Sequence, residues 1–266
     1  MRNLFFVGLI GLSPLVSSAP ALAGHHEEVK ADAISAAVAA PTREEKNKAR
    51  DIYRHPIETL QFFGVKPDQT VVEFIPGGGW YTQILAPLVR DHGRYIGLQP
   101  TQKSVDSLKA MMAAQPAPYD KAQVLLWPAS DAIAPGSVDS VLTFRNIHNM
   151  VMNDKAPETF AAFFAMLKPG GTLGIVDHRL PESADSSAEL KSGYLKVSTV
   201  RKLAEDAGFV LEAASEINAN PKDAADWDKG VWTLPPTLTN GAVDREKYLE
   251  IGESDRMTLR FRKPAA

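Results

Sequence analysis

Apolar residues along the chain follow two alternating patterns. Short runs rich in Val, Ile and Leu, typical of buried strands, are separated by segments in which apolar positions recur every three or four residues, as on one face of a helix. This alternation predicts an α/β fold of the Rossmann-like, doubly wound type, with a mostly parallel seven-stranded sheet and an antiparallel C-terminal strand. The strand-like runs cover residues 71–75, 94–99, 123–127, 137–144, 172–177, 209–214 and 256–262.

Helical patterns precede the first strand and connect the later ones. The main segments cover residues 43–53, 57–63, 101–114, 157–167 and 198–207, with Ser198 as the expected N-cap of the last helix. Polar residues stand where the predicted strands end. Because the carboxyl ends of parallel strands share one edge of a sheet, and ligands of open α/β sheets bind there, we expect these residues to surround a ligand. They are Glu73, Gln99, Asp131, Arg145 and Asp177.

Three consecutive glycines, Gly77, Gly78 and Gly79, follow the first strand and precede a helical pattern. Glycine permits positive φ angles and close approach of a ligand to the backbone, and a following helix offers unpaired N–H groups. We therefore interpret this turn as a cofactor cradle, with a tight turn that binds nothing as the alternative. Gln99 lies 20 positions after Gly79, the spacing expected of a ribose-binding residue, although Asp or Glu is usual there.

The N-terminus has the pattern of a secretory signal peptide. A positive start, an apolar run over residues 4–16 and the closing Ala21-Leu22-Ala23 predict cleavage after Ala23 and a periplasmic or secreted protein. An uncleaved anchor is the alternative. We expect residues 24–42 to be a flexible leader and residues 43–266 a single domain, with an insert at about 218–252 that serves as a lid or a packing surface. The new terminus Gly24-His25-His26 could hold Cu(II), although a solvated tail is our expectation.

Composition narrows the range of partners. The chain of 266 residues has a formal net charge of −3 and no basic stripe, which disfavours binding to nucleic acid. It contains no cysteine, so thiolate zinc sites and cysteine nucleophiles are excluded, and we expect no metal site in the domain. No second apolar run is long enough to span a bilayer, so we expect no stable membrane insertion after cleavage and a small-molecule substrate.

The order of these elements resembles the class I S-adenosylmethionine-dependent methyltransferases over roughly residues 43–263. The resemblance rests on residues 72–79 as the first motif, on Leu167-Lys168-Pro169-Gly170-Gly171 and on residues 203–209; more narrowly, it extends to a group of exported methyltransferases with Gly-Gly-Gly-Trp-Tyr and Phe-Arg-Asn-x-His-Asn runs. The family usually has glycine where Ile75 stands and an acidic residue where Gln99 stands.

This resemblance implies that S-adenosylmethionine is the cofactor. The backbone of Gly77–Gly79 would meet its methionine part, Glu73 would hold its amino group, Gln99 its ribose and Asp131 its adenine amine. Tyr53 stands with Arg54 and His55 where a proline interrupts a helix. We assign Tyr53 to the cofactor site as well, with a surface bend that binds nothing as the alternative.

Arg145, His148 and Asn149 follow the fourth strand, at the position that faces the transferable methyl group in this fold. His148 is the expected general base or acceptor-orienting group, Arg145 the residue that binds the acceptor, and Asn149 the residue that fixes either one. The alternative is that His148 is a structural histidine with its hydrogen bonds satisfied, capping the following helix.

Two other functions stay open at this point. One is an NAD-linked oxidoreductase, disfavoured because the full G-x-G-x-x-G spacing is absent. The other is an exported protein that binds a nucleotide or another small molecule on the same fold without methyl transfer.

Overall fold

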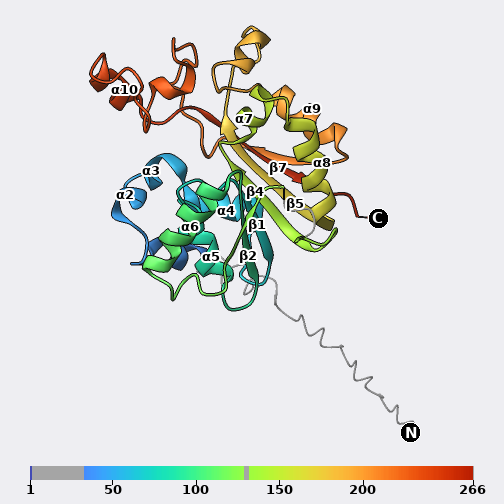
Figure 1. Cartoon of the computed structure of the whole chain (residues 1–266). Helices are drawn as coiled ribbons and strands as arrows, with labels where there is room; N and C mark the ends of the chain where they lie inside the picture. Colours follow the sequence, from blue (N-terminus) through green and yellow to red (C-terminus); the bar gives the residue numbers. More distant parts are fainter. Residues whose placement is uncertain (2–32, 129–131, 266) are drawn as a thin grey trace.

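A computed structural model describes Met1 and residues 33–128 and 132–265. Its centre is one seven-stranded sheet in the order β3-β2-β1-β4-β5-β7-β6 (Figure 1). Strand β7 runs antiparallel to both of its neighbours, and the remaining pairs are parallel. The predicted sheet is thereby confirmed. The strands are β1 Thr70–Phe74, β2 Arg94–Gln99, β3 Gln123–Leu126, β4 Val138–Phe144, β5 Leu167–His178, β6 Val210–Ser215 and β7 Arg256–Arg262.

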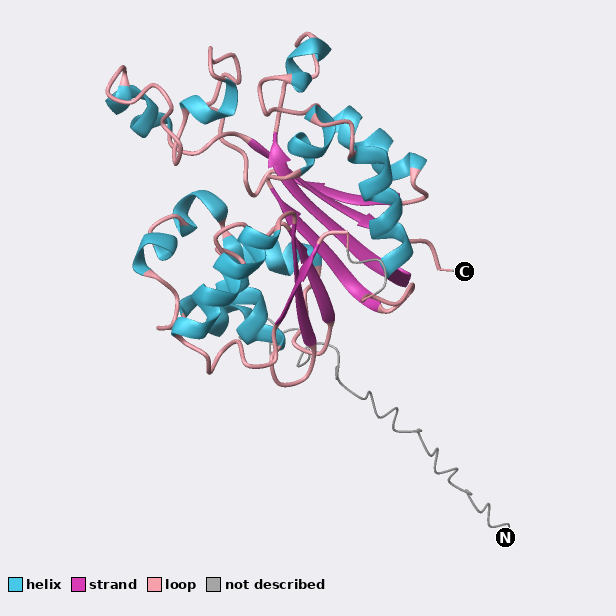
Figure 2. Cartoon of the chain, viewed as in Figure 1, coloured by secondary structure: helices cyan, strands magenta, loops and turns pink. Residues whose placement is uncertain are grey.

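Helices cover both faces of the sheet (Figure 2). One face carries α4, α5 and α6, and the other carries α7, α8 and α9. The helices are α2 Glu45–Lys48, α3 Asp51–Arg54, α4 Pro56–Phe63, α5 Thr82–Val89, α6 Gln102–Ala114, α7 Ile147–Met152, α8 Ala156–Met166, α9 Val197–Asp206 and α10 Arg245–Ile251, with short 3-10 turns at Ser186–Leu190 and Gly230–Thr233.

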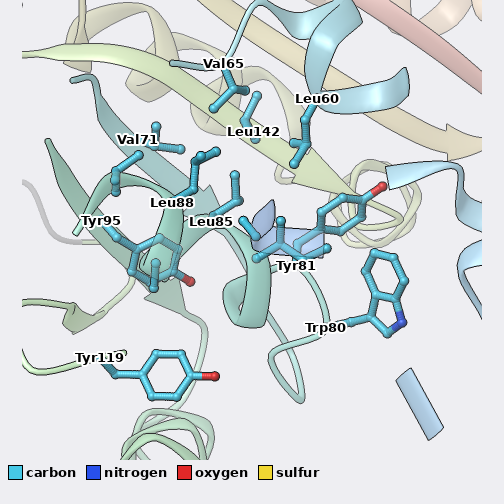
Figure 3. Packing of buried hydrophobic residues seen from close by; sticks show 14 of the residues in the cluster. Leu60, Val65, Val71, Trp80, Tyr81, Leu85, Leu88, Tyr95, Tyr119 and Leu142 are labelled. Carbon is cyan, nitrogen blue, oxygen red and sulfur yellow. The ribbon is translucent and has the colours of Figure 1, made fainter. Parts of the chain in front are cut away.

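Strand β1 has buried side chains on both faces of the sheet. Successive side chains of a strand point to opposite faces, so neighbouring residues join different clusters. Val71 joins the cluster under α4, α5 and α6, whereas Val72 and Phe74 join the cluster under α8 and α9. Trp80 and Tyr81, which directly follow the glycines, lie in the first cluster with their ring centroids 4.6 Å apart (Figure 3). The glycine turn is therefore attached to the core on both of its sides.

The N-terminal region differs from the prediction of a flexible leader over residues 24–42. Residues 33–39 are helical, and Ile34, Ala37 and Val38 are buried in the first cluster. Their spacing of three and four residues places them on one helix face, a signal that the alanine-rich composition hid. The signal peptide and Gly24-His25-His26 lie outside the described residues.

Two helical predictions also need correction. The segment expected to be helical over 43–53 is broken into α2 and α3, which are separated by Ala49 and Arg50. The N-cap of α9 is Lys196; Ser198 lies inside the helix, and its Oγ donates to Glu182 (2.6 Å).

The insert between β6 and β7 packs on the domain through a small apolar cluster. Val231 and Ala225 of the insert meet Leu180 and Tyr194, with Trp227 and Trp232 partly buried beside them. Among the described residues, no helix has both the length and the apolar character needed to cross a bilayer.

Candidate active site

The glycine turn after β1 presents open backbone to solvent-accessible space. Gly77 has a φ of +58°, and a Cβ at Gly77 or Gly78 would meet no atom within 4 Å. Gly79, with φ +86°, instead packs against α6, where a Cβ would lie 2.6 Å from Met111 Cε. Two of the three glycines thus leave room for a ligand, and the third allows a close contact between turn and helix.

Ile75 begins this turn with a φ of 53°. A β-branched side chain is strained in the left-handed region, whereas glycine is not. This explains why the family usually has glycine there, and it places a strained residue at the edge of the site.

A cavity of about 280 Å³ lies against the turn; we call it the glycine-turn cavity. Its walls come from three separate segments: the turn itself, the region of α2 and α3, and the end of β4. The lining residues are Glu44, Lys46, Asn47, Arg50, Arg54, Glu73, Ile75, Pro76, Gly77, Gly78, Trp80, Tyr81, Phe144, Arg145 and Asn146.

Glu73 lines this cavity but is held by hydrogen bonds within the core. Its Oε2 accepts from the hydroxyls of Thr82 (2.8 Å) and Tyr95 (2.6 Å), and the residue is 2% exposed. Burial raises the pKa of Glu73 to about 7, and the two hydroxyls oppose that rise. Glu73 is therefore a carboxyl group that a nearby cation would convert to its ionised form.

Gln99 has a different position from the one its spacing predicts. It is fully buried and does not line the glycine-turn cavity; its Nε2 donates to the carbonyl of Gly77 (2.8 Å), while its Oε1 is buried without a partner among the described residues. The residue therefore fixes the shape of the turn. Asp131, the predicted partner of an adenine amine, lies outside the described residues.

Tyr53 lines a separate cavity, about 290 Å³ in volume, together with His55. Its ring packs against Gly252, where a Cβ would lie 2.7 Å from Tyr53 Cε1. Of the three neighbours Tyr53, Arg54 and His55, the structure places only Arg54 in the glycine-turn cavity. The left-handed backbone of His55 (φ 40°) ends α3 just before Pro56, and the short helix turns Tyr53 and Arg54 to different sides.

Several arginines gather around one carboxylate beside the glycine-turn cavity. Glu253 contacts Arg50 (2.6 Å), Arg54 (3.3 Å) and Arg256 (3.2 Å). Burial would raise the pKa of Glu253, but these guanidinium groups outweigh it and lower that pKa to about 2. Burial, followed by the charge of Arg145, holds the pKa of Arg54 well below its usual value, and Arg54 Nη2 is buried without a hydrogen-bond partner. The cluster therefore carries excess positive charge and favours an anionic ligand.

The residues that follow β4 contact the glycine turn and line a second cavity as well. Asn146 Nδ2 donates to the carbonyls of Phe74 (3.0 Å) and Ile75 (3.2 Å), which ties β4 to the glycine turn. Arg145, in the left-handed region with a φ of 65°, lines both cavities. Burial lowers the pKa of Arg145 to about 10.

His148 belongs to a buried network centred on Asp177. The Asp177 carboxylate accepts the backbone N–H groups of Ile147 (2.7 Å), His148 (3.2 Å) and His178 (2.8 Å), and its Oδ1 lies 2.8 Å from His148 Nδ1. These contacts hold the start of α7 and orient the His148 ring. Asp177 rather than His148 caps α7, while the buried and hydrogen-bonded position of His148 agrees with the structural part of the alternative.

The second cavity has a volume of about 240 Å³ and is lined by His148 and His178; we call it the histidine cavity. The sequence predicted the joint position of Arg145, His148 and Asn149, and the structure brings all three to its wall. Tyr194 does not line it; its hydroxyl donates to Asp223 (2.9 Å) inside the insert. The other lining residues are His178, Val231, Trp232, Pro235, Pro236 and Thr237, so the insert forms one side.

Within the described ranges, His148, Asp177 and His178 form the one group whose spacing could hold a metal ion. Hydrogen bonds already account for its arrangement. Both Asp177 oxygens accept N–H donors, and burial, followed by the charges of His148 and Arg145, lowers the pKa of His178. A cation would meet an electrostatically unfavourable site.

The comparisons with known proteins bear on the fold. No protein-family model matches the sequence, and no curated protein matches it. A methyltransferase from Aquifex aeolicus, dependent on S-adenosylmethionine, superposes with a TM-score of 0.57 at 15% identity, covering 88% of this chain and 98% of that chain. A geranyl diphosphate C-methyltransferase from Streptomyces coelicolor A3(2), solved with Mg²⁺, geranyl diphosphate and S-adenosyl-L-homocysteine, has a TM-score of 0.52 at 15% identity over 86% of this chain and 87% of that chain.

The same architecture supports other chemistry. The (4+2)-cyclase SpnF superposes with a TM-score of 0.56 at 15% identity, covering 83% of this chain and 81% of that chain. Identities this low establish architecture, and the strand order and the antiparallel β7 agree with it. The chain therefore has the class I fold of the S-adenosylmethionine-dependent methyltransferases.

Proposed function

We propose that the protein transfers a methyl group from S-adenosylmethionine to a small-molecule acceptor in the cell envelope. The observation that carries this proposal is the open backbone of Gly77 and Gly78 at the end of β1, next to a cavity between that turn and the end of β4. This is the edge at which open α/β sheets bind their ligands.

The residues of the glycine-turn cavity fit the amino-acid end of that cofactor. Arg54, with its buried and unpartnered Nη2, would hold a carboxylate, and Glu73 would face an ammonium group. Gly77 and Gly78 leave the space that a Cβ would fill. When bound, S-adenosylmethionine supplies an electrophilic methyl group on a sulfonium sulfur. Asp131 remains our proposed partner of the adenine amine, whereas Gln99 supports the glycine turn without lining the cavity.

Calorimetry of the protein starting at Gly24 tests the cofactor assignment. Titrations with S-adenosylmethionine, S-adenosylhomocysteine and NAD should give binding to the first two only. Binding of NAD alone would favour the oxidoreductase alternative. Absence of binding by all three would contradict the proposal.

The histidine cavity would bind the acceptor. His148 would take a proton from the acceptor or orient it, Arg145 would bind it, and Asn149 would fix either side chain. We expect His148→Ala to lower turnover with an identified acceptor while leaving cofactor affinity unchanged. Unchanged turnover would remove His148 from the mechanism, and lost cofactor affinity would place it in the cofactor site.

A binding protein without methyl transfer is the second candidate. It is favoured by the presence of Gln99 and Ile75 at positions where the family has other residues, and by the export pattern, because S-adenosylmethionine is made in the cytoplasm. Tight binding of S-adenosylhomocysteine without turnover of any acceptor would support it.

We propose that the protein is exported and begins at Gly24. Mass spectrometry of the periplasmic or secreted fraction should find this terminus; an intact Met1 in the cytoplasm would contradict it.

A further inference from the structure

The histidine cavity contains a cation without a counter-ion. Among residues 33–128 and 132–265, no side chain forms a hydrogen bond or an ion pair with the guanidinium of Arg145. Glu253 and Asp177 act on it only at longer range, and Arg256 and Arg50 oppose them. Arg145 is half-buried, and partial removal of a charge from water is unfavourable unless an anion or several acceptors complete its surroundings. Arg145 therefore provides a site for a negatively charged ligand atom.

The same cavity contains a proton acceptor. Asp177 accepts three backbone N–H groups, and with the His148 ring as donor of the fourth contact we assign the ring proton to Nδ1. In neutral His148 this leaves the lone pair on Nε2, which has no hydrogen-bond partner in the described part of the chain. His148 lines the cavity, and its Nδ1 contacts the fully buried Asp177.

The second histidine of the cavity is kept neutral. His178 Nδ1 lies 2.5 Å from Ser254 Oγ, and burial, followed by the charges of His148 and Arg145, holds the pKa of His178 well below its usual value. Among the residues that the structure describes, no Asp or Glu lines the histidine cavity. An acceptor that binds as a cation, such as an ammonium compound, would thus lack a counter-charge.

Most of the residues that the insert contributes to the histidine cavity are apolar. Trp232, Pro235 and Pro236 line it, and the Trp232 ring meets that of His148 edge-on, with centroids 6.3 Å apart. The volume of about 240 Å³ lies below the range of about 300–1,000 Å³ of typical ligand pockets. One ring with small substituents matches this volume and the apolar side chains of the insert.

Resting on the methyl transfer proposed above, we infer that the acceptor is a small aromatic hydroxyl compound, a phenol, bound as its anion between Arg145 and His148. The phenol O–H bond breaks, its proton goes to Nε2 of His148, and the electron pair stays on the oxygen, which pairs with the guanidinium of Arg145. The ring lies against Trp232 and the two prolines.

Binding of 4-nitrophenol tests this inference without any cofactor, because its anion has its own absorption band. At a pH below the pKa of the free probe, the wild-type protein should bind it and produce the phenolate band. Nitrobenzene, which lacks the hydroxyl, and benzoate, which has no proton to transfer, should each bind at least about tenfold more weakly. Benzoate binding as tight as the phenol would overturn the inference, and so would loss of the band in a chelator, which would indicate a metal-bound phenolate.

Variants separate the two roles. Arg145→Gln should weaken binding of the probe about tenfold or more, and Arg145→Lys, which keeps the charge, should restore part of it. His148→Gln should bind the probe without the phenolate band. His92→Gln and Arg201→Gln, at exposed positions away from the cavity, serve as controls and should behave as wild type. Circular dichroism confirms folding, and a band unchanged in both Arg145→Gln and His148→Gln would refute the inference.

Failure of this inference is distinguishable from failure of the proposed function. A protein that binds S-adenosylmethionine by calorimetry but no phenol has a different acceptor class. Binding of 4-nitrophenol as its anion without binding of S-adenosylmethionine would support the phenol site and contradict the proposed methyl transfer.

Discussion

Glu253 is the residue whose removal should most clearly disturb the arginine cluster. It is 3% exposed and is contacted by Arg50, Arg54 and Arg256. Glu253→Gln keeps the shape of the side chain but leaves three guanidinium groups without a counter-charge. Removing one partner of a buried ion pair costs about 3–5 kcal/mol of unfolding free energy.

The pKa of Glu253 gives a second value for the contribution of its carboxylate to the unfolding free energy. Folding lowers it from 4.5 to about 2, and at 1.36 kcal/mol per pH unit this difference corresponds to about 3 kcal/mol. Because the folded-state pKa lies below the unfolded one, this stability is present above pH 4.5 and is lost as the pH falls toward 2. The difference between wild type and Glu253→Gln should therefore shrink over that interval.

Urea unfolding followed by tryptophan fluorescence, at pH 7 and at steps down to pH 3, measures both effects. Glu216→Gln is the matched control, because Glu216 also pairs with an arginine, Arg179, but its side chain is 73% exposed. Exposed pairs contribute about 0–1 kcal/mol. If Glu253→Gln is no less stable than this control at pH 7, the cluster does not depend on its carboxylate and the reasoning is wrong.

Three further predictions concern the site itself. Gly78→Val should abolish S-adenosylmethionine binding in calorimetry without changing the melting temperature, since its Cβ enters open space; equal binding would place the cradle elsewhere. Gln99→Asp should lower the unfolding free energy by about 2 kcal/mol, because the hydrogen bond from Nε2 to the Gly77 carbonyl is lost and a carboxylate is buried. Calorimetry should show no gain in cofactor affinity; tighter binding would place residue 99 at the ribose. Asp177→Asn should lower turnover about 10²-fold, because the His148 ring would no longer be held with its proton on Nδ1, and cofactor affinity should stay unchanged. Full turnover would show that Asp177 does not orient the base.

The sequence by itself determined the sheet and the position of the site along it. Strand β2 covers residues 94–99, as its apolar run predicts, and the paired terminal strands follow from their own runs. Period-two and period-3.6 patterns reflect burial on one face of a single element, so they can be read locally. The joint position of Arg145, His148 and Asn149 follows from the same logic, since all three stand directly after one strand.

Only the tertiary structure decided which partner each site residue has. Glu253 lies 203 positions from Arg50, and Asp177 lies 29 positions from His148, so no local pattern links them. The buried Gln99 and the different directions of Tyr53 and Arg54 depend on how the turn and the break at His55 pack against other elements. Hydrogen bonds and ion pairs need their atoms within about 3 to 4 Å, and that precision arises only when distant segments are fixed by a common core.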